Sequence, residues 1–218
     1  MPLLPLSPDE LLTTTRAVRK RLDLTRPVAD DLIRECVAAA MQAPSGSNRM
    51  TMQFVVVRDR DKRQAIGQIY RQCYERYRSL DGVYIGSIDK GSDRANAQQA
   101  RSAASADHLA EHMGDAPALV IPCTGGRTDG LPGSLAAGML GNVLPATWSF
   151  MLAARARGLG TCWTTLHLAR EREVAEIVGI PYDDVQQVCL SPVAHTVGTD
   201  FRPADRPEPE TIIHWDTW

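Results

Sequence analysis

The segment from Ser134 to Arg157 constrains the fold more than any other part of this chain. Its residues are nearly all apolar or small, and its length is close to the roughly 20 apolar residues that a membrane-spanning helix needs. However, Gly138, Gly141, Asn142 and Pro145 interrupt the segment, and topogenic flanks are absent. We therefore expect a long, mostly buried helix in a soluble core or at a dimer interface.

Start and stop signals predict the other helices. Ser7-Pro8-Asp9-Glu10 forms a capping box, with Ser at the N-cap and Glu three positions later. Asp30-Asp31 begins a second helix, because acidic residues stabilise a helix N-terminus, and Pro44 ends it. Further helices are expected near residues 60–78 and 99–113 and over Glu171 to Val178, while Gly158 and Gly179 act as C-terminal caps.

Three apolar runs predict buried strands: Gln53–Val57, Ala118–Cys123 and Gln186–Val193. Residues 79–98 are rich in Gly, Ser, Asp and Gln, which predicts a surface excursion with the composition of a mobile lid. The tail from Asp200 is rich in Pro and Trp, so we expect it to lie against another surface rather than form a helix. There is no internal repeat and no second domain, and residues 1–218 are read as one domain.

The overall charge and the cysteines limit the protein class. A formal net charge of −2 gives no global field toward nucleic acid or an anionic membrane. The N-terminal residues lack a basic leader and a full apolar region, so no signal peptide is predicted. The five cysteines are scattered and none forms a CxxC pair, which favours a reduced, cytoplasmic protein over a disulfide scaffold.

Three segments carry residues suited to ligand binding. Arg16 and Arg19 lie in a basic cluster near the start, and Arg206 lies in the tail; arginine forks suit phosphate oxygens, although such residues are more often only solvated. The loop Ala43-Pro44-Ser45-Gly46-Ser47-Asn48 combines a helix stop, a flexible glycine and polar side chains. The run Gly158-Leu159-Gly160-Thr161-Cys162-Trp163-Thr164-Thr165 is not a dinucleotide fingerprint, because Trp163 replaces its last glycine.

Together these segments resemble the FMN-dependent nitroreductase family. The resemblance rests on Thr15-Arg16-Ala17-Val18-Arg19, on the 43–48 loop, on Arg155 to Trp163 and on the ending with His214-Trp215-Asp216. Their order and spacing match along nearly the whole chain, most closely to actinobacterial members. The resemblance implies an α+β fold with a central, mostly antiparallel sheet flanked by helices. It also implies an intertwined homodimer with two FMN molecules at the interface.

The resemblance assigns cofactor-binding residues position by position. Arg16 and Arg19 would hold the FMN phosphate, with Arg206 returning from the tail, and Ala17 stands where many members have Ser. Pro44, Ser45, Gly46 and Asn48 would line the flavin and its ribityl chain, and Trp163, Thr164 and Thr165 would pass the flavin edge. The chain departs from the common pattern at Arg49-Met50-Thr51-Met52 and at Trp148-Ser149, both near the expected substrate side.

The implied activity is hydride relay from NADH or NADPH to a small organic acceptor, of the nitroaromatic or quinone type, by a ping-pong scheme. Because hydride transfer is the chemistry of the flavin itself, no catalytic side chain is required, and the sequence contains no convincing triad. The lid at 79–98 would border the acceptor site. Reduction of an activated alkene or azo compound, flavin-dependent dehydrogenation, and a flavin-binding sensor or storage dimer remain alternatives.

Two patterns compete with this interpretation. His108-Leu109-Ala110-Glu111-His112 matches the inverted zinc-protease pattern, but so short a pattern arises easily by chance and no third ligand is evident, so no metal is predicted. Cys162 has no partner cysteine and is read as a buried apolar residue rather than a redox thiol.

Overall fold

A six-stranded antiparallel sheet forms the centre of the molecule in the computed structural model, which describes residues 3–218. The order β1-β6-β3-β2 is extended by β4, which pairs with β6, and by β5, which pairs with β3. This confirms the mostly antiparallel sheet. The strands are β1 (Leu22–Asp23), β2 (Met52–Val57), β3 (Ala118–Gly125), β4 (Leu159–Thr161), β5 (Val185–Gln187) and β6 (Ser191–Thr196).

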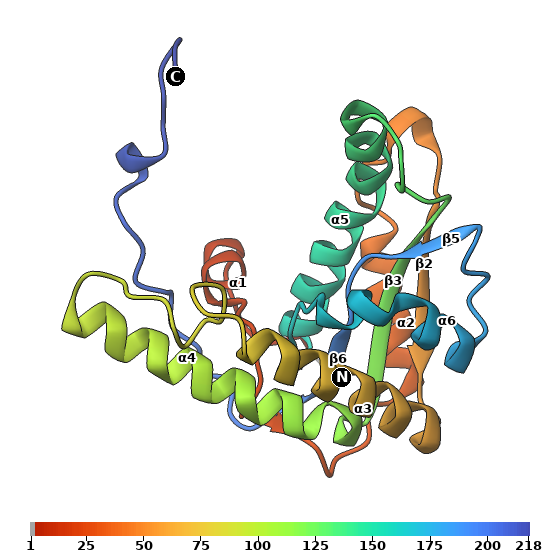
Figure 1. Cartoon of the computed structure of the whole chain (residues 1–218), viewed down its shortest axis with the longest axis horizontal. Helices are drawn as coiled ribbons and strands as arrows, with labels where there is room; N and C mark the ends of the chain where they lie inside the picture. Colours follow the sequence, from red (N-terminus) through yellow and green to blue (C-terminus); the bar gives the residue numbers. More distant parts are fainter. Residues whose placement is uncertain (1–2) are drawn as a thin grey trace.

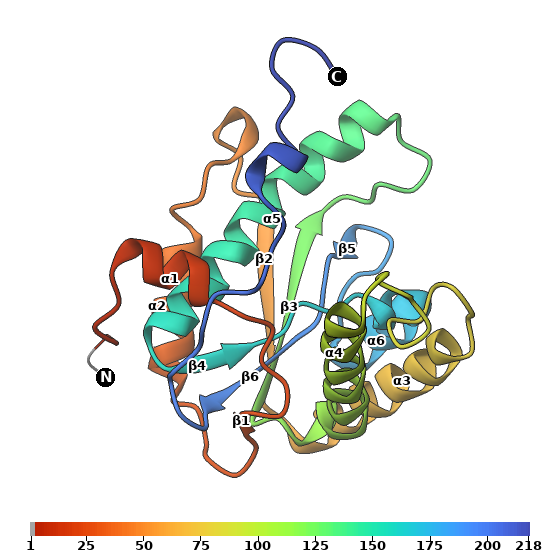
Figure 2. The ribbon, with the colours of Figure 1, turned by 90° about the vertical axis from the view of Figure 1, so that its left-hand side faces the viewer.

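Helices cover both faces of the sheet, as Figures 1 and 2 show. Helices α2 and α5 pack together on one face, whereas α3 and α6 cover the other and α4 packs outside α3. Their bounds are α1 (Pro8–Thr14), α2 (Asp30–Ala40), α3 (Arg60–Arg78), α4 (Asp93–His112), α5 (Gly133–Ala156) and α6 (Glu171–Val178). The 3-10 turns are η1 (Gly46–Asn48), η2 (Met113–Asp115), η3 (Leu166–Arg170) and η4 (Pro209–Thr211).

Strand β3 shows how the sequence divides the core. Alternate strand residues point to opposite faces, so Leu119 and Ile121 pack with α3 and α6, while Ala118 and Val120 pack with α2 and α5. All four side chains are fully buried. A strand covered on both sides needs apolar residues at every position, which explains the unbroken apolar run.

The predicted helix ends are confirmed where a local hydrogen bond or backbone conformation fixes them. At α1 the Ser7 amide donates to Glu10 Oε2 at 2.8 Å, and the Glu10 amide donates to Ser7 Oγ at 3.2 Å. Gly179 follows α6 with φ of 76°, and Gly158 follows α5 with φ of 72°. Both glycines adopt the left-handed conformation that disfavours other residues.

Two predicted boundaries are wrong. Helix α4 begins at Asp93, not near residue 99, because the Ser92 side chain accepts a hydrogen bond from the Ala95 amide and caps it. The excursion therefore spans residues 79–92. The strand expected at 186–193 is two strands, β5 and β6, because the intervening Leu190 exchanges backbone hydrogen bonds with Thr164 at 2.8 and 3.0 Å.

Tyrosine contacts attach the excursion at 79–92 to α3, and a glutamine attaches it to α4. The Tyr84 ring lies 5.5 Å from the Tyr77 ring in an edge-on contact, and the Ile85 amide donates to the Tyr77 hydroxyl at 2.8 Å. From α4, the Gln99 side chain donates to the Ile85 carbonyl at 2.8 Å. These contacts hold the excursion against the two helices; that it borders the acceptor site stays a prediction.

Helix α5 is less buried than expected. It is the one helix of residues 3–218 that is long and apolar enough to cross a membrane by length and composition, with mean hydropathy 1.3 in its most apolar window, of which 28% is buried. Its buried residues begin at Val143, whereas Leu135, Leu144 and Trp148 are 58%, 38% and 43% exposed. The first half of this apolar helix is thus largely uncovered by the described residues.

The C-terminal tail also lacks the expected cover. In Figure 1 the chain beyond about residue 200 runs away from the sheet and past α4. Ile212, Trp215 and Trp218 are 77%, 82% and 102% exposed. Large exposed apolar side chains are typical of surfaces that meet another molecule.

His167 in η3 gives the fold a dependence on pH. The side chain is fully buried, and neither ring nitrogen has a hydrogen-bond partner within the described chain. Burial lowers the pKa of His167 to about 4, because a charged imidazolium loses its hydration. Protonation therefore favours the unfolded chain, in which the pKa is about 6.5.

We predict that this histidine destabilises the protein as the pH falls from about 6.5 toward 4. At pH 5 its contribution is a loss of about 2 kcal/mol in the free energy of unfolding relative to neutral pH. Urea unfolding of the wild type and of His167→Leu at pH 7.5 and pH 5 checks this. The variant should lose less stability between the two values, and equal losses would contradict the prediction.

Candidate functional site

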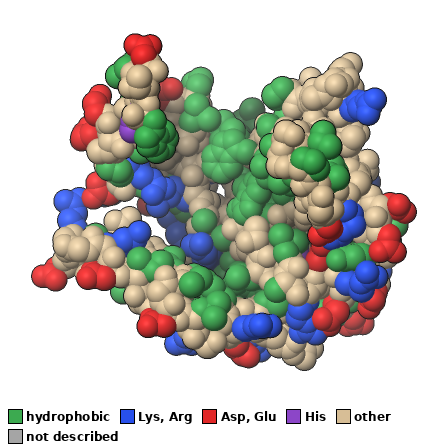
Figure 3. Space-filling model, turned by 45° about the horizontal axis from the view of Figure 1, so that its top comes forward, with side chains coloured by type: hydrophobic (Ala, Val, Ile, Leu, Met, Phe, Trp, Pro, Cys, Tyr) green, Lys and Arg blue, Asp and Glu red, His purple; other side chains and the backbone are tan. Residues whose placement is uncertain are grey.

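A cavity of about 480 Å³ with a basic lining lies between the segment that follows α1, helix α4 and the C-terminal tail. In Figure 3, Lys and Arg side chains lie beside the tail at the edge of a wider hollow whose opposite side is apolar; α5 contributes no residue to the cavity itself. The cavity is lined by Arg16, Ala17, Arg19, Arg94, Gln98, Arg101, Ser102, Ser105, Pro203, Ala204 and Asp205. Three segments distant in sequence thus form one site.

Strand β4 positions the first of these segments. The Val18 amide donates to the Thr161 carbonyl at 2.8 Å, and Ala17 forms an isolated parallel bridge with Thr161. Arg16 Nη1 donates to the Arg202 carbonyl at 2.8 Å, which joins this segment to the tail. The backbone from Arg16 to Arg19 is therefore held between the sheet and the tail.

The cavity has a strong excess of positive charge. It is lined by four arginines, Arg16, Arg19, Arg94 and Arg101, and by one carboxylate, Asp205. Arg94 pairs with Asp205 at 2.5 Å, whereas among residues 3–218 the other three arginines take part in no ion pair. Guanidinium groups gathered without counter-ions provide the charge-assisted donors that a phosphate needs.

Arg155 holds the start of the C-terminal tail against the rest of the chain. This side chain is 4% exposed, and its Nη2 donates to Thr14 Oγ1 at 3.2 Å and to the Thr199 carbonyl at 3.0 Å. Arg21 and Arg155 lie 4.2 and 4.9 Å from the ring centroid of Phe201. Burial, with the charge of Arg21 nearby, lowers the pKa of Arg155. This anchor fixes the start of the tail segment that lines the cavity.

The segment after β4 passes the same region. Thr164 exchanges backbone hydrogen bonds with Leu190, and its Oγ1 donates to the Leu190 carbonyl at 2.7 Å. Trp163 and Thr164 are partly buried and Thr165 is exposed. Cys162 is fully buried, and burial raises its pKa, so its thiol is not poised as a nucleophile.

The loop with Pro44, Ser45, Gly46 and Asn48 lies elsewhere. It ends α2 and contacts α5, and Figures 1 and 2 place residues 43–50 at the opposite end of the molecule from residues 15–22. The Gly46 amide donates to Asn142 Oδ1 at 2.5 Å. One chain therefore does not bring the two predicted halves of the cofactor site together.

The backbone of this loop is strained at non-glycine positions. Ser47 and Asn48 have φ of 54° and 53°, in the left-handed region that costs such residues free energy. Strain of this kind is concentrated at functional sites. Gly46 itself does not have a positive φ, but its lack of a side chain allows a close approach, since a Cβ there would lie 3.1 Å from Asn142 Oδ1.

Among the predicted arginines, Arg206 lies outside the cavity. It lines a neighbouring depression together with Arg94, Gln98 and Asp205, and it is exposed. The sequence interpretation missed Arg94 and Arg101. Arg94 lay in the stretch up to residue 98 that was read as irregular surface, so Arg101, although inside the helix expected at 99–113, had no arginine to share its face. Their spacing of seven, with Gln98 between them, is the signal that would have placed both on one helix face.

A metal site is not supported for the described chain. Among residues 3–218 no group of three or more His, Cys, Asp or Glu side chains is placed to hold a metal ion. The rings of His108 and His112 lie 4.5 Å apart, and His112 Nδ1 lies 2.9 Å from Asp115 Oδ2. The two histidines of the His-x-x-Glu-His pattern therefore stack on each other on α4, and His112 pairs with Asp115.

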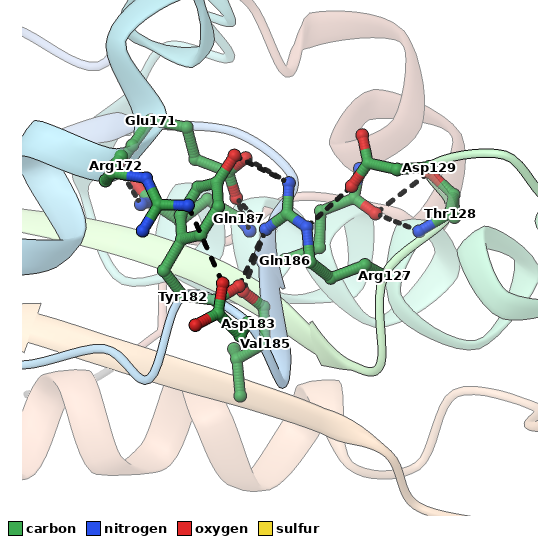
Figure 4. A network of polar contacts seen from close by, with 10 residues as sticks. All are labelled: Arg127, Thr128, Asp129, Glu171, Arg172, Tyr182, Asp183, Val185, Gln186 and Gln187. Carbon is green, nitrogen blue, oxygen red and sulfur yellow. Dashed lines mark hydrogen bonds and ion pairs between the residues drawn. The ribbon is translucent and has the colours of Figure 1, made fainter.

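A second polar cluster, drawn in Figure 4, joins the loop before α5 to α6. Arg127 Nη2 lies 2.8 Å from Glu171 Oε2, and the two side chains are only 15% and 10% exposed. The Glu171 carboxylate also accepts a hydrogen bond from the Gln187 amide at 2.7 Å. Arg127 and Arg172 each lie 4.0 Å from the ring centroid of Tyr182. The charged groups of the cluster pair with one another, while Gln187 Oε1 has no hydrogen-bond partner among the described residues. We therefore give this cluster a structural role.

Known proteins resemble this chain over nearly its whole length. The family model described as the nitroreductase family matches residues 12–198. A protein of Archaeoglobus fulgidus, provisionally named NADH dehydrogenase/NAD(P)H nitroreductase, is 23% identical over 211 residues, which cover 96% of this chain and 97% of that protein.

Two solved structures illustrate the shared fold. One is a variant of NfnB, described as an FMN- and NADPH-dependent nitroreductase from Sphigopyxis sp. strain HMH, with a TM-score of 0.66, 22% identity and coverage of 98% of this chain and 100% of that one. The other is oxidised iodotyrosine deiodinase bound to FMN and 3-iodo-L-tyrosine, with a TM-score of 0.67, 19% identity and coverage of 96% and 99%.

Proposed function

The chain belongs to the nitroreductase family, and from this premise we propose that it is an FMN-dependent oxidoreductase. Hydride would pass from NADH or NADPH to a small organic acceptor of the nitroaromatic or quinone type, in a ping-pong scheme. The cavity lined by four arginines and one carboxylate carries the proposal, because it offers what the phosphate of FMN requires. The two solved relatives named above are described with FMN.

The residues of the cavity fit a phosphate at its inner end. Arg16 and Arg19 are partly buried and belong to a segment that is hydrogen-bonded to β4, so their positions are fixed before any ligand binds. Ala17 contributes its backbone only, which leaves the arginines as the main donors. Trp163, Thr164 and Thr165 continue from the same strand and would face the flavin edge.

The protein side chains would bind and orient rather than react. Bound FMN supplies the hydride chemistry. The arginines and backbone amides would favour negative charge on the reduced ring system. No catalytic side chain is assigned. All five cysteines are free and buried, and burial raises the pKa of Cys36 to about 11 and of Cys123 to about 12, so neither thiol is poised to react. Free cysteines without disulfides are consistent with the proposed cytoplasmic location.

We further propose a homodimer in which each site uses both chains. The Pro44–Asn48 loop lies at the opposite end of the molecule from the arginine cavity, so a second copy would have to bring one half of the site to the other. The exposed apolar face of α5 and the exposed tail tryptophans provide the surface for such an assembly.

The assembly gives a direct prediction. Light scattering should report twice the 23.9 kDa chain mass at micromolar concentration. Leu144→Glu with Trp148→Glu should shift the protein toward the monomer, because both side chains lie on the exposed face of α5 and charges there oppose burial. The control Leu80→Glu changes a leucine outside α5 that is at least as exposed as Leu144 and should leave the dimer intact. A monomeric wild type would refute the proposal.

The spectrum and the turnover of purified protein test the function itself. The protein should be yellow, release FMN on denaturation, and oxidise NADH or NADPH in the presence of a nitroaromatic or quinone acceptor. Bound FMN without turnover for any such acceptor would favour a sensor or storage role. Colourless protein that does not bind added FMN would overturn the proposal.

A further inference from the structure

The four arginines of the cavity differ in depth. Arg16 and Arg19 are partly buried, whereas Arg94 and Arg101 are exposed on α4 at the rim. One phosphate with close to two negative charges does not balance the excess of three positive charges. The rim arginines are therefore available to a second anion.

One face of α4 carries all the polar groups that the helix contributes to the cavity. They lie at Arg94, Gln98, Arg101, Ser102 and Ser105. This spacing of four, seven, eight and eleven residues follows the helical repeat. The face offers guanidinium, amide and hydroxyl donors and no apolar side chain, so it suits an anion rather than an uncharged aromatic acceptor.

We propose that Arg94 and Arg101 form a separate subsite for a phosphate group of the pyridine nucleotide. The inference rests on the proposed function, in which NADH or NADPH is the exchangeable anionic ligand. FMN, which stays bound, would occupy the partly buried Arg16 and Arg19. The nucleotide, which enters and leaves at every turnover, would bind the exposed Arg94 and Arg101. Either the diphosphate shared by both nucleotides or the extra 2′-phosphate of NADPH supplies the required chemistry.

The Asp205 carboxylate occupies the position beside Arg94 where the phosphate would bind. Its Oδ2 lies 2.5 Å from Arg94 Nη2, and the Arg94 and Asp205 side chains are 85% and 58% exposed. An exposed pair is worth little, so an incoming phosphate can displace the carboxylate. Removing the Asp205 charge should therefore favour the nucleotide, the opposite of removing the arginine charges.

The test compares three variants of the flavin-loaded protein by steady-state kinetics. Arg94→Gln with Arg101→Gln should raise the KM for the nucleotide about tenfold, and Asp205→Asn should lower it severalfold. The FMN dissociation constant should stay within about twofold of the wild type in both. The control Arg76→Gln removes an exposed charge on α3 outside the cavity and should change none of these values.

Different nucleotides distinguish the two phosphate sources. A rise in KM for NADPH alone identifies the 2′-phosphate, whereas equal rises for NADPH and NADH identify the diphosphate. An unchanged KM for both nucleotides, or a lost FMN affinity in the double arginine variant, would overturn the subsite. A wild type without FMN would instead overturn the proposed function, so the two failures are distinct.

Discussion

Protein carrying both Arg16→Ala and Arg19→Ala is expected to purify without flavin colour. Each hydrogen bond to a charged group is worth roughly 1.5–3 kcal/mol. Loss of both arginines should thus weaken FMN binding by roughly 100- to 10,000-fold. Absorbance of the purified protein and fluorescence titration of the apoprotein with FMN measure the effect. Excess FMN should restore turnover, because the arginines bind the cofactor and do not react.

Two single variants serve as controls for this result. Arg206→Ala should have a smaller effect, since Arg206 lines the neighbouring depression and not the cavity. Arg34→Ala changes an exposed arginine of α2 remote from the cavity and should have none. Full flavin content in the Arg16 and Arg19 double variant would refute the phosphate site.

Glu171→Gln should produce the largest loss of stability among the single changes considered. The Arg127–Glu171 pair is nearly buried, and Glu171 helps hold the pKa of Arg127 above its ordinary value. Removing Glu171 leaves Arg127 with only the exposed carboxylate of Asp129 at 2.6 Å as counter-charge, and breaking a buried ion pair costs up to about 3–5 kcal/mol. Urea unfolding at fixed protein concentration measures this, and the midpoint should fall clearly.

Glu173→Gln is the matched control for this change. It lies two residues away on the same helix and pairs with Arg170, but the Arg170 and Glu173 side chains are 35% and 47% exposed. Surface ion pairs contribute about 0–1 kcal/mol, so the midpoint should hardly move. Similar losses in both variants would show that the Arg127 cluster is not the origin of the effect.

Sequence analysis predicted the elements whose ends depend on local chemistry. The capping box at Ser7 and the glycines at 158 and 179 act within one helical turn, so the helix ends that they set can be predicted from the local sequence. The start of α4 was missed because its Ser92 cap is hidden among other turn-forming residues. The division between β5 and β6 depends on the pairing of Leu190 with Thr164, a contact across 26 residues that no local pattern reveals.

The candidate site was predicted in part for the same reason. Arg16 and Arg19 lie in a recognisable segment, and the structure places both in one cavity. Arg101 already lay in the helix expected at 99–113, but its partnership with Arg94 became visible only when α4 was known to begin at Asp93. The position of Arg206 depends on the path of the tail, which is fixed by the buried Arg155 and its contact with Thr199, far away in sequence.

Apart from the Arg16–Arg19 segment, which is hydrogen-bonded to β4, the walls of the cavity come from parts of the chain that form no strand of the sheet. The α4 residues that line it occupy mainly the first half of the helix, whereas the buried α4 side chains are Ala103, Leu109 and Ala110. The tail segment at 203–205 likewise adds no strand. Descendants of this gene can therefore exchange the first turns of α4 and the tail for others while inheriting an unchanged core, so ligand preference can diverge faster than the fold.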